Sequence, residues 1–544
     1  MAEHTIEYDH PLLGHLIGVL VENGTIAQFR GIKFADVPGR FRQSVVMDKL
    51  VKSDFTTYGP ACMQPDLVKY HQTPSFGGRI EPTDFGYSEL DCLNLTLTVP
   101  ASLLTKPGQT VPILTWIHGG AYRMGFGAVS GIENGRGLVS RSIAIGKPVI
   151  VINIQYRLNV FGFLASEEIK AYNKSHGEPF GNFYFYDLRN GLAWIKKFAP
   201  GFGGDIEEIT AFGESAGAIA VSQLIVGAGA SENPPFKRAI LESGFASLLG
   251  PEPISFHETI YDLIVKNFVG EIQPGESKLE KLLALPAEGF IDFDLLPQVF
   301  FPVVDGELFS ERLVLDKAIE ITAKQDWLES FLVGDCANEG VLFAHEYAPD
   351  KMERMTEMIE RSYSSDVMGK IPKILEDFKV PSLITGTAVA TEELANYTYM
   401  VGSIMFNAQV YAAARDPNKA GTGKKKAYLY HFDKANILFS EKENRVFGYC
   451  NHALDVLYVF SNLVKLMQSQ PSIKDDPVLV KREATVSDSL ATKWIEYGYG
   501  IKPWDQAKVG VIAADGDGTW EVMTEEEDIE KNGRHVKEWL TILS

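Results

Sequence analysis

The sequence of 544 residues has only four cysteines, too few for a disulfide scaffold in a chain of this length. It has no apolar run approaching the roughly 20 residues that span a bilayer. The longest such run, around 149–154, has the length of a buried strand. Residues 1–13 are polar and acidic and do not resemble a signal peptide. We therefore expect no transmembrane segment and a cytoplasmic location.

Positive charge is also scarce, because 51 Lys and Arg against 71 Asp and Glu leave a formal net charge of −20. Nucleic acids and anionic membrane surfaces are bound by clustered cations, so the composition argues against both as partners. The sequence lacks His-Glu-X-X-His, Cys-X-X-Cys and the glycine patterns of nucleotide-binding loops. No metal or cofactor is implied, and the oligomeric state stays open.

The domain organisation is simple, since no linker, low-complexity tract or internal repeat divides the chain. We expect one domain over 1–544. Two segments, about 251–323 and 349–396, are less regular, with amphipathic patches broken by prolines. We interpret them as insertions that roof the active site and supply specificity.

Short apolar runs rich in β-branched residues recur along the chain, as expected of strands buried on both faces. They lie at 93–99, 112–117, 149–155, 209–212, 239–241, 331–333 and 427–431, with a hairpin over 18–29 around Asn23-Gly24. Helical spacing appears between them, at 187–198, 215–225 and 486–497. The alternation predicts an α/β fold with a large, mostly parallel central sheet and helices on both faces. Catalytic residues should then follow strand ends.

A candidate nucleophile follows the strand predicted at 209–212, in the sequence Gly213-Glu-Ser-Ala-Gly217. Gly-X-Ser-X-Gly between a strand and a helix presents a serine on a sharp turn. The two glycines leave room for that turn, and the helix N-terminus favours developing negative charge. A chance match in a chain with 49 glycines would lack this context. We predict Ser215 as the nucleophile.

A glycine-rich turn, His118-Gly-Gly-Ala-Tyr122, follows the strand predicted at 112–117. Such a turn before the nucleophile can aim backbone N–H groups at an oxyanion. We predict Gly120, Ala121 and Ala216 as the donors. Gly119, Tyr122 and Glu214 are expected to line the substrate site.

Ordered matches over nearly the whole chain carry a family resemblance. They fall at 30–35, 89–95, 116–122, 153–158, 162–164, 187–189, 202–205 and 212–217. The chain resembles the type-B carboxylesterases, which include cholinesterases and several fungal lipases, and a fungal member fits best. The resemblance implies an α/β-hydrolase fold and a serine esterase.

The sequence departs from that family at a few positions. Ala121 replaces the third glycine of the oxyanion turn, and Ala453 replaces the glycine after the family's histidine, which we interpret as a conservative change. The family's Glu-Asp-Cys is one residue longer here, at 89–92. Cys62 and Cys92 resemble the family's first disulfide, but in an intracellular chain both can stay thiols.

The acid and then the histidine follow the serine in chain order in this fold. Asp335 and Glu339 both follow the strand predicted at 331–333, and the segment resembles the family's Glu-Gly, so Glu339 is predicted as the acid with Asp335 as its competitor. His452 matches the family's histidine segment and is predicted as the base, with Ser243 supporting the triad. The other histidines beyond Glu339 are His345, His431 and His535.

These residues predict hydrolysis of a small-molecule ester through an acyl-enzyme on Ser215. The same machinery serves lipases, lactonases and acyltransferases, so the acyl and alcohol preferences stay open. An inactive binding relative would lack a member of the triad, and all three are present.

Overall fold

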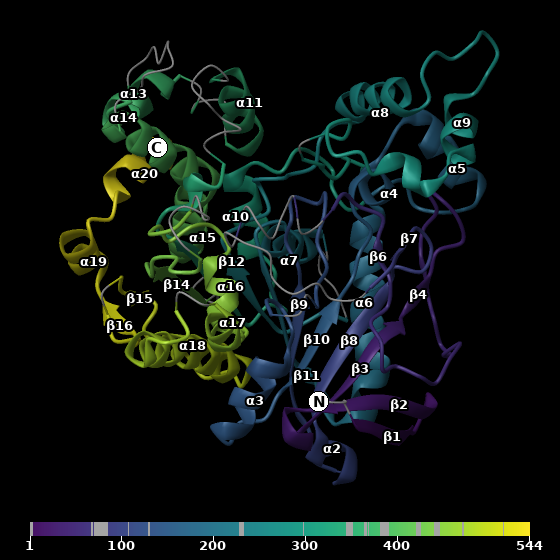
Figure 1. The fold of residues 1–544 in the computed structure, drawn as a ribbon. Helices are drawn as coiled ribbons and strands as arrows, with labels where there is room; N and C mark the ends of the chain where they lie inside the picture. The colour runs from purple at the N-terminus through teal and green to yellow at the C-terminus, as the bar shows by residue number, and fades with distance from the viewer. Residues whose placement is uncertain are drawn as a thin grey trace.

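A sheet of 12 strands runs through the molecule, as the ribbon in Figure 1 shows. The structure is a computed structural model that describes residues 4–543 except 67–68, 70–74, 76–84, 107, 129–130, 228–232, 298, 344–351, 364–366, 368, 381–390, 420–425, 440–445, 471–472 and 515. The strand order across the sheet is β1-β2-β3-β8-β10-β9-β11-β12-β13-β14-β15-β16.

The centre of the sheet is parallel and its two margins are antiparallel. The antiparallel margins are β1 (His4–His10), β2 (Gly14–Val21), β3 (Ile26–Lys33) and β8 (Asn94–Pro100) on one side and β16 (Glu521–Met523) on the other. The parallel strands are β10 (Ile150–Ile154), β9 (Val111–Ile117), β11 (Gly204–Glu214), β12 (Arg238–Glu242), β13 (Ser330–Cys336), β14 (Lys426–Phe432) and β15 (Val509–Ile512). The predicted α/β class and mostly parallel sheet are confirmed.

The central strands are buried on both faces, which explains their uninterrupted apolar runs. Every residue of β9, β10 and β12 is buried. Ile113 of β9 packs into the core on one face, while Leu114 and Trp116 pack into the core on the other. Because successive side chains point to opposite faces, one short strand contributes to both cores.

Helices cover both faces of the sheet, as predicted. One face carries α6 (Phe183–Phe198), α7 (Ala216–Gly227), α10 (Leu315–Ala323) and α15 (Ala408–Lys419). The other carries α3 (Arg136–Ala144), α16 (Leu454–Val459), α17 (Leu463–Ser469) and α18 (Pro477–Gly498). Helix α18 begins nine residues before the predicted 486, where Asp476 caps the N–H groups of Val478 and Leu479.

The two predicted insertions supply helices beyond the sheet. Figure 1 shows α8 (Ile254–Phe268) and α9 (Lys278–Ala284) in one lobe and α11 (Met352–Ser362), α13 (Ile371–Asp377) and α14 (Thr391–Gly402) in another, both at the same end of the sheet. Helix α10 falls within the predicted segment 251–323 but packs into the core through Ala318 and Ile319. Part of the segment 349–396 lies outside the described residues.

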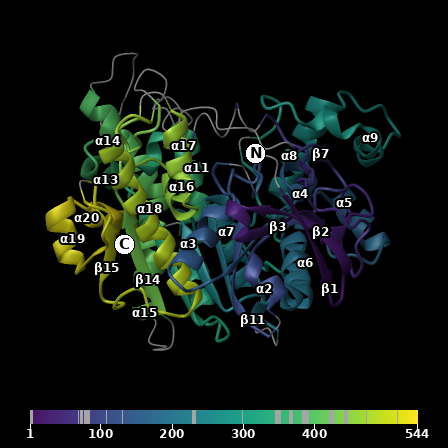
Figure 2. The ribbon, with the colours of Figure 1, turned by 60° about the horizontal axis from the view of Figure 1, so that its bottom comes forward.

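Smaller elements complete the chain. They are β4 (Ala35–Asp36), β5 (Val45–Val46), β6 (Ala61–Cys62), β7 (Tyr87–Ser88), α2 (Ala101–Thr105), α4 (Asn159–Phe163), α5 (Glu167–Ser175), α19 (Glu525–Asn532) and α20 (Val536–Leu543). In Figure 2 the N-terminal strands β1 and β2 lie on the opposite side of the molecule from α19 and α20.

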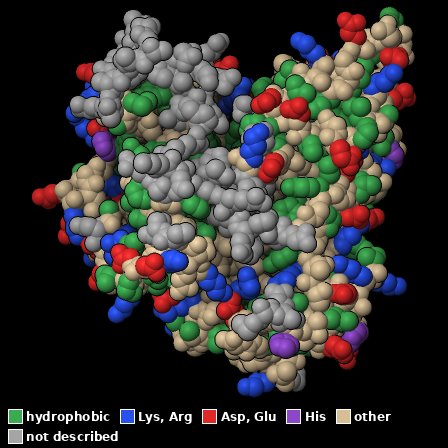
Figure 3. Space-filling model, viewed as in Figure 1, with side chains coloured by type: hydrophobic (Ala, Val, Ile, Leu, Met, Phe, Trp, Pro, Cys, Tyr) green, Lys and Arg blue, Asp and Glu red, His purple; other side chains and the backbone are tan. Residues whose placement is uncertain are grey.

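The face of the molecule in Figure 3 is mixed in charge. Figure 3 shows acidic and basic side chains interspersed over the face in view. Within the part of the chain that the structure describes, no helix is long and apolar enough to cross a membrane.

Candidate active site

Ser215 lies on the turn between β11 and α7, in a left-handed conformation with φ of 54°. Its N–H donates to the carbonyl of Glu242 at 2.8 Å, which fixes the turn against β12. A Cβ on Gly217 would lie 2.1 Å from the carbonyl oxygen of Ile117, and one on Gly213 would lie 2.6 Å from the same atom. Only glycine allows β9 to approach this closely, so the motif's glycines are a packing requirement.

Glu339 and His452 meet at the carboxyl ends of the strands. Glu339 lies three residues after the end of β13, and its Oε2 lies 2.5 Å from Nδ1 of His452. Its other oxygen accepts hydrogen bonds from the Ser243 hydroxyl at 2.6 Å and the Cys336 N–H at 2.8 Å. These two donors orient the carboxylate, so Oε2 is directed at the imidazole.

The loops that carry the acid and the base are bound directly to each other. The Asn338 N–H donates to the carbonyl of Cys450 at 2.8 Å, and the Cys450 N–H donates to Oδ1 of Asn338 at 3.1 Å. Phe343 and Phe406 pack on the His452 ring at centroid distances of 5.1 and 4.4 Å. The His452 imidazole is therefore held by these two phenyl rings as well as by the Glu339 carboxylate.

The second nitrogen of His452 faces Glu214, with Nε2 2.9 Å from Oε1. Among the described residues no hydrogen bond joins the Ser215 hydroxyl to His452. Burial lowers the pKa of His452, but the carboxylates of Glu214 and Glu339 outweigh it and raise the value to about 10. Burial raises the pKa of Glu214. Glu214 was predicted to line the substrate site, whereas the structure places its carboxylate against the imidazole.

Two of the predicted oxyanion donors lie close to Ser215, since Ala216 follows it directly and Ala121 lines the same cavity. Gly120 has φ of 102°, and a Cβ there would lie 2.0 Å from the carbonyl oxygen of Met124. Within the described part of the chain, the N–H groups of Gly120, Ala121 and Ala216 have no hydrogen-bond partner. Backbone N–H groups without a partner are the kind of donor that can stabilise an oxyanion.

A cavity of about 490 Å³ opens over Ser215 and Ala121. Apolar side chains form most of its wall. They come from α7, the segment after β12, the two predicted insertions and the surroundings of His452: Ile219, Leu248, Leu249, Ile260, Leu263, Val299, Phe301, Phe343, Met358, Met405 and Phe406. Two charged residues, Glu357 and Arg361, complete the lining. The volume and chemistry suit a small apolar ligand with its polar group at Ser215.

The sequence profile described as the Carboxylesterase family matches residues 5–531. The chain belongs to the carboxylesterase family. Lipase 3 of Yarrowia lipolytica (strain CLIB 122 / E 150) is 26% identical over 499 residues, covering 91% of this chain and 89% of that protein. The para-nitrobenzyl esterase of Bacillus subtilis (strain 168) is 26% identical over 507 residues, covering 89% and 88%.

Solved structures of esterases share the fold of this carboxylesterase-family chain. A PNB esterase structure superposes with a TM-score of 0.71 at 22% identity, covering 98% of this chain and 99% of that one. The juvenile hormone esterase of Manduca sexta gives a TM-score of 0.72 at 22% identity, covering 99% and 98%. The predicted α/β-hydrolase fold is confirmed.

Two residues predicted to line the substrate site have other contacts. Tyr122 is fully buried, and its hydroxyl donates to Oε1 of Gln223 at 2.9 Å, so the side chain belongs to the core beneath the turn. A Cβ on Gly119 would lie 2.7 Å from Oε2 of Glu214 and 3.2 Å from Cβ of Ser215. Gly119 therefore allows the oxyanion turn to approach the nucleophile, and neither residue supplies a side chain to the cavity.

The competing acid, Asp335, pairs with a different histidine. Its Oδ1 lies 2.5 Å from Nδ1 of His431 on β14, and its Oδ2 accepts from Asn407 at 2.7 Å. His535 is half exposed and packs against Tyr399 in a tilted arrangement, with the ring centroids 4.3 Å apart. His345 lies outside the described residues.

Both alanines that replace family glycines have a backbone conformation that favours glycine. Ala121 has φ of 57° and Ala453 has φ of 69°, both in the left-handed region that favours glycine. The interpretation of Ala453 as a conservative change is therefore wrong, because its Cβ is strained. Sequence alone does not reveal the backbone conformation.

The cysteine pair implied by the resemblance consists of two free, buried thiols, Cys62 and Cys92. A contact with Cys62 and burial together hold the pKa of Cys92 well above its usual value. The Leu158 N–H donates to the Cys62 sulfur at 3.3 Å.

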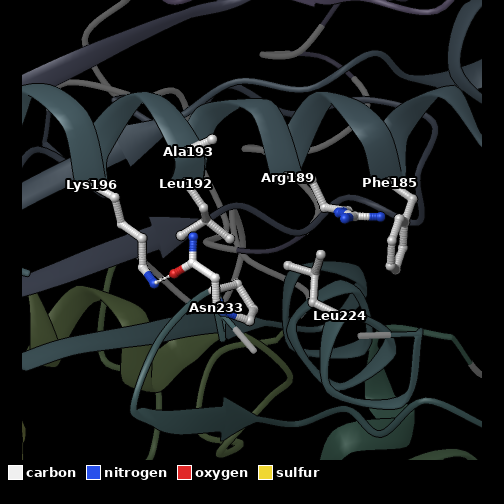
Figure 4. A pocket seen from close by; sticks show the side chains of 8 residues that line it. Phe185, Arg189, Leu192, Ala193, Lys196, Leu224 and Asn233 are labelled. Carbon is white, nitrogen blue, oxygen red and sulfur yellow. Dashed lines mark hydrogen bonds between the residues drawn. The ribbon is translucent and has the colours of Figure 1, made fainter. Parts of the chain in front are cut away.

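A second, smaller cavity of about 150 Å³ lies between α6 and α7, away from Ser215 (Figure 4). The Lys196 ammonium at its edge donates to Oδ1 of Asn233 at 2.7 Å, as the dashed line shows. Phe185, Leu192 and Leu224 form its apolar part. Its lining contains no serine, cysteine or histidine.

Proposed function

We propose that this carboxylesterase-family chain is a serine carboxylesterase that hydrolyses carboxylic esters through an acyl-enzyme on Ser215. The observation that carries the proposal is the contact of His452 with both Glu339 and Glu214, the residue directly before Ser215. The contact supports a role for His452 as the base, because nucleophilic serine catalysis requires an imidazole that is oriented by a carboxylate and lies near the serine.

The proposed reaction has two steps. The Ser215 hydroxyl oxygen attacks the ester carbonyl while Nε2 of His452 takes its proton, and the N–H groups of Gly120, Ala121 and Ala216 donate to the oxyanion. The tetrahedral intermediate collapses, the C–O bond to the alcohol breaks, and His452 protonates the leaving oxygen. Water then repeats the sequence on the acyl-enzyme, releasing the acid and restoring the serine. Nε2 must leave Glu214 for the first step, so that it can face the Ser215 hydroxyl.

The experiment is hydrolysis of p-nitrophenyl esters from C2 to C16 by the purified protein and by Ser215→Ala. Activity in the wild type that is lost in the variant supports the proposal. A fluorophosphonate probe should label the wild type alone, since only an activated serine reacts with it. A folded wild type that neither labels nor hydrolyses any of the esters would contradict the proposal.

A lipase is the second candidate, because the cavity wall is almost wholly apolar and a relative over most of the chain is named Lipase 3. Hydrolysis of emulsified tributyrin and triolein tests it. A preference for the emulsified long-chain triacylglycerol over soluble short esters would favour the lipase.

A further inference from the structure

The cavity over Ser215 changes character along its length. At the inner end, Phe343 and Phe406 line it and also pack on His452. At the outer end, the lining includes Leu263 of α8, which is 39% exposed, and Glu357 of α11, whose side chain is 50% exposed. The cavity therefore leads from the triad to solvent between α8 and α11.

Arg361 occupies the outer end in a fixed position. Its Nε lies 3.7 Å from Oε1 of Glu252, a carboxylate that is only 1% exposed. Its guanidinium carbon lies 4.8 Å from the ring centre of Phe256 and 5.3 Å from that of Phe301, another residue of the cavity wall. A buried carboxylate and two aromatic rings thus hold the charge at the rim.

The Arg361 guanidinium is held in place, but most of its hydrogen-bond donors have no protein partner among the described residues. Arginine has five N–H donors, and among the described residues Arg361 makes one hydrogen bond, from Nη2 to Oε2 of Glu357 at 3.4 Å. The remaining donors need water, which reaches a side chain that is 25% exposed. An apolar chain that covered this group would remove that water without replacing its hydrogen bonds, which is unfavourable.

We propose, on the basis of the function proposed above, that Arg361 determines specificity by setting the length of the apolar ester chain that the cavity accepts. Each methylene buried against the apolar wall should raise kcat/KM about fourfold. The gain should stop at the methylene that reaches the Arg361 guanidinium. Esters with longer chains should then show a plateau or a fall in kcat/KM.

The test compares Arg361→Met with a matched control, Arg312→Met. Arg312 contacts the same buried carboxylate, with Nη2 2.6 Å from Oε2 of Glu252, but it does not line the cavity. Two ester series are measured, p-nitrophenyl esters of increasing acyl length and n-alkyl acetates of increasing alcohol length. In one of the series, Arg361→Met should extend the rise beyond the wild-type plateau and increase the long-to-short ratio of kcat/KM by about tenfold. Arg312→Met should keep the wild-type profile.

The outcomes separate this inference from the proposed function. Equal shifts in both variants, or an unchanged profile in an active, folded Arg361→Met, would overturn it, because a general disturbance lowers all esters alike. Calorimetric binding of n-alkanols from C4 to C12 requires the cavity but no catalysis. If the wild type hydrolyses none of the esters, the proposed function fails. The inference is still supported if the alkanol Kd reaches a plateau with chain length in the wild type and Arg361→Met removes that plateau. The same Kd series in both proteins would refute it.

Discussion

Two buried histidine–carboxylate pairs lie at neighbouring strand ends, and they differ in what the second ring nitrogen faces. In both, a carboxylate oxygen lies 2.5 Å from Nδ1: Glu339 with His452, and Asp335 with His431. Both histidine side chains are almost fully buried. The near-identical contact means that a short distance to a carboxylate does not by itself identify a catalytic histidine.

The surroundings of Nε2 distinguish the pairs. Nε2 of His452 faces Glu214 beside the nucleophile and the cavity. Nε2 of His431 lies 3.7 Å from Asp528 of α19, whose carboxylate also binds Arg534 at 3.1 Å. The His431 pair is thus closed by the C-terminal helices and holds them to the sheet. We therefore propose that the His452 pair transfers protons and that the His431 pair stabilises the fold.

Removing the base should have the largest effect. We expect His452→Gln to lower kcat for ester hydrolysis by about 10⁴-fold, since one lost triad member disables the unit. His431→Gln, the matched control, should keep kcat in its folded fraction. Steady-state kinetics on a p-nitrophenyl ester checks both, and a comparable fall in the two variants would erase the distinction between the pairs.

Loss of the Asp335–His431 pair should lower the stability of the fold more than loss of the Glu339–His452 pair. Asp335→Ala leaves His431 and the nearby charges without a buried partner, and we expect the free energy of unfolding to fall by about 3–5 kcal/mol. Glu339→Gln, which keeps the volume of the acid, should lose activity with a smaller loss of stability. Urea unfolding followed by circular dichroism measures this. Equal stability of Asp335→Ala and the wild type would show that the second pair carries no structural role.

Glu214 should control the pH dependence of the catalytic pair. The base must be neutral to accept a proton, and a His452 pKa of about 10 makes it mostly protonated near neutral pH. We therefore expect kcat/KM to rise with pH towards that value. Glu214→Gln removes one of the two charges that raise the pKa, so the rising limb should move to lower pH.

A pH profile of kcat/KM for wild type and Glu214→Gln decides this point. Glu320→Gln is a suitable control, because its half-exposed carboxylate lies on α10, does not line the cavity and is not among the groups that shift His452. An unshifted limb in Glu214→Gln would mean that Glu214 does not act on the imidazole.

We expect the smallest effect from relieving the backbone strain at Ala453, the residue after His452. Ala453→Gly relieves a left-handed strain of about 1–2 kcal/mol but adds unfolded-state entropy, so we expect a net stabilisation of up to about 1 kcal/mol. Ala171→Gly, at an exposed position inside α5, should instead destabilise by about 0.5–1 kcal/mol. Thermal unfolding of the two variants distinguishes them, and a loss of stability in both would argue against strain at residue 453.

Much of the fold follows from sequence because the central strands are buried on both faces and leave a clear apolar signal. β9, β10 and β12 appear where they were predicted. The edge strand β1 was missed, since its sequence is polar and most of its residues are exposed. Strand pairing at an edge is decided by the neighbour, here β2, rather than by the strand's own composition.

The residues of the candidate site were likewise predicted only where a local motif or the family resemblance marks them. Ser215 and the turn at 118–122 carry local motifs, and the acid and base were located by resemblance. The contact between Glu214 and His452 joins residues 238 positions apart in number, so no local pattern could indicate it. Likewise, Asp335 is the last but one residue of β13 and Glu339 lies three residues after its end, so only their partners on other elements distinguish the two carboxylates.

The direct binding of the Asn338 loop to the Cys450 loop also bears on how the protein matures. Glu339 and His452 are 113 positions apart, and several helices and β14 must assemble before their loops can meet. Closing so long a loop is slow compared with forming local helices. Recovery of esterase activity after dilution from denaturant should therefore lag behind recovery of helical content. Activity would then report when the contact between Glu339 and His452 forms, late in folding.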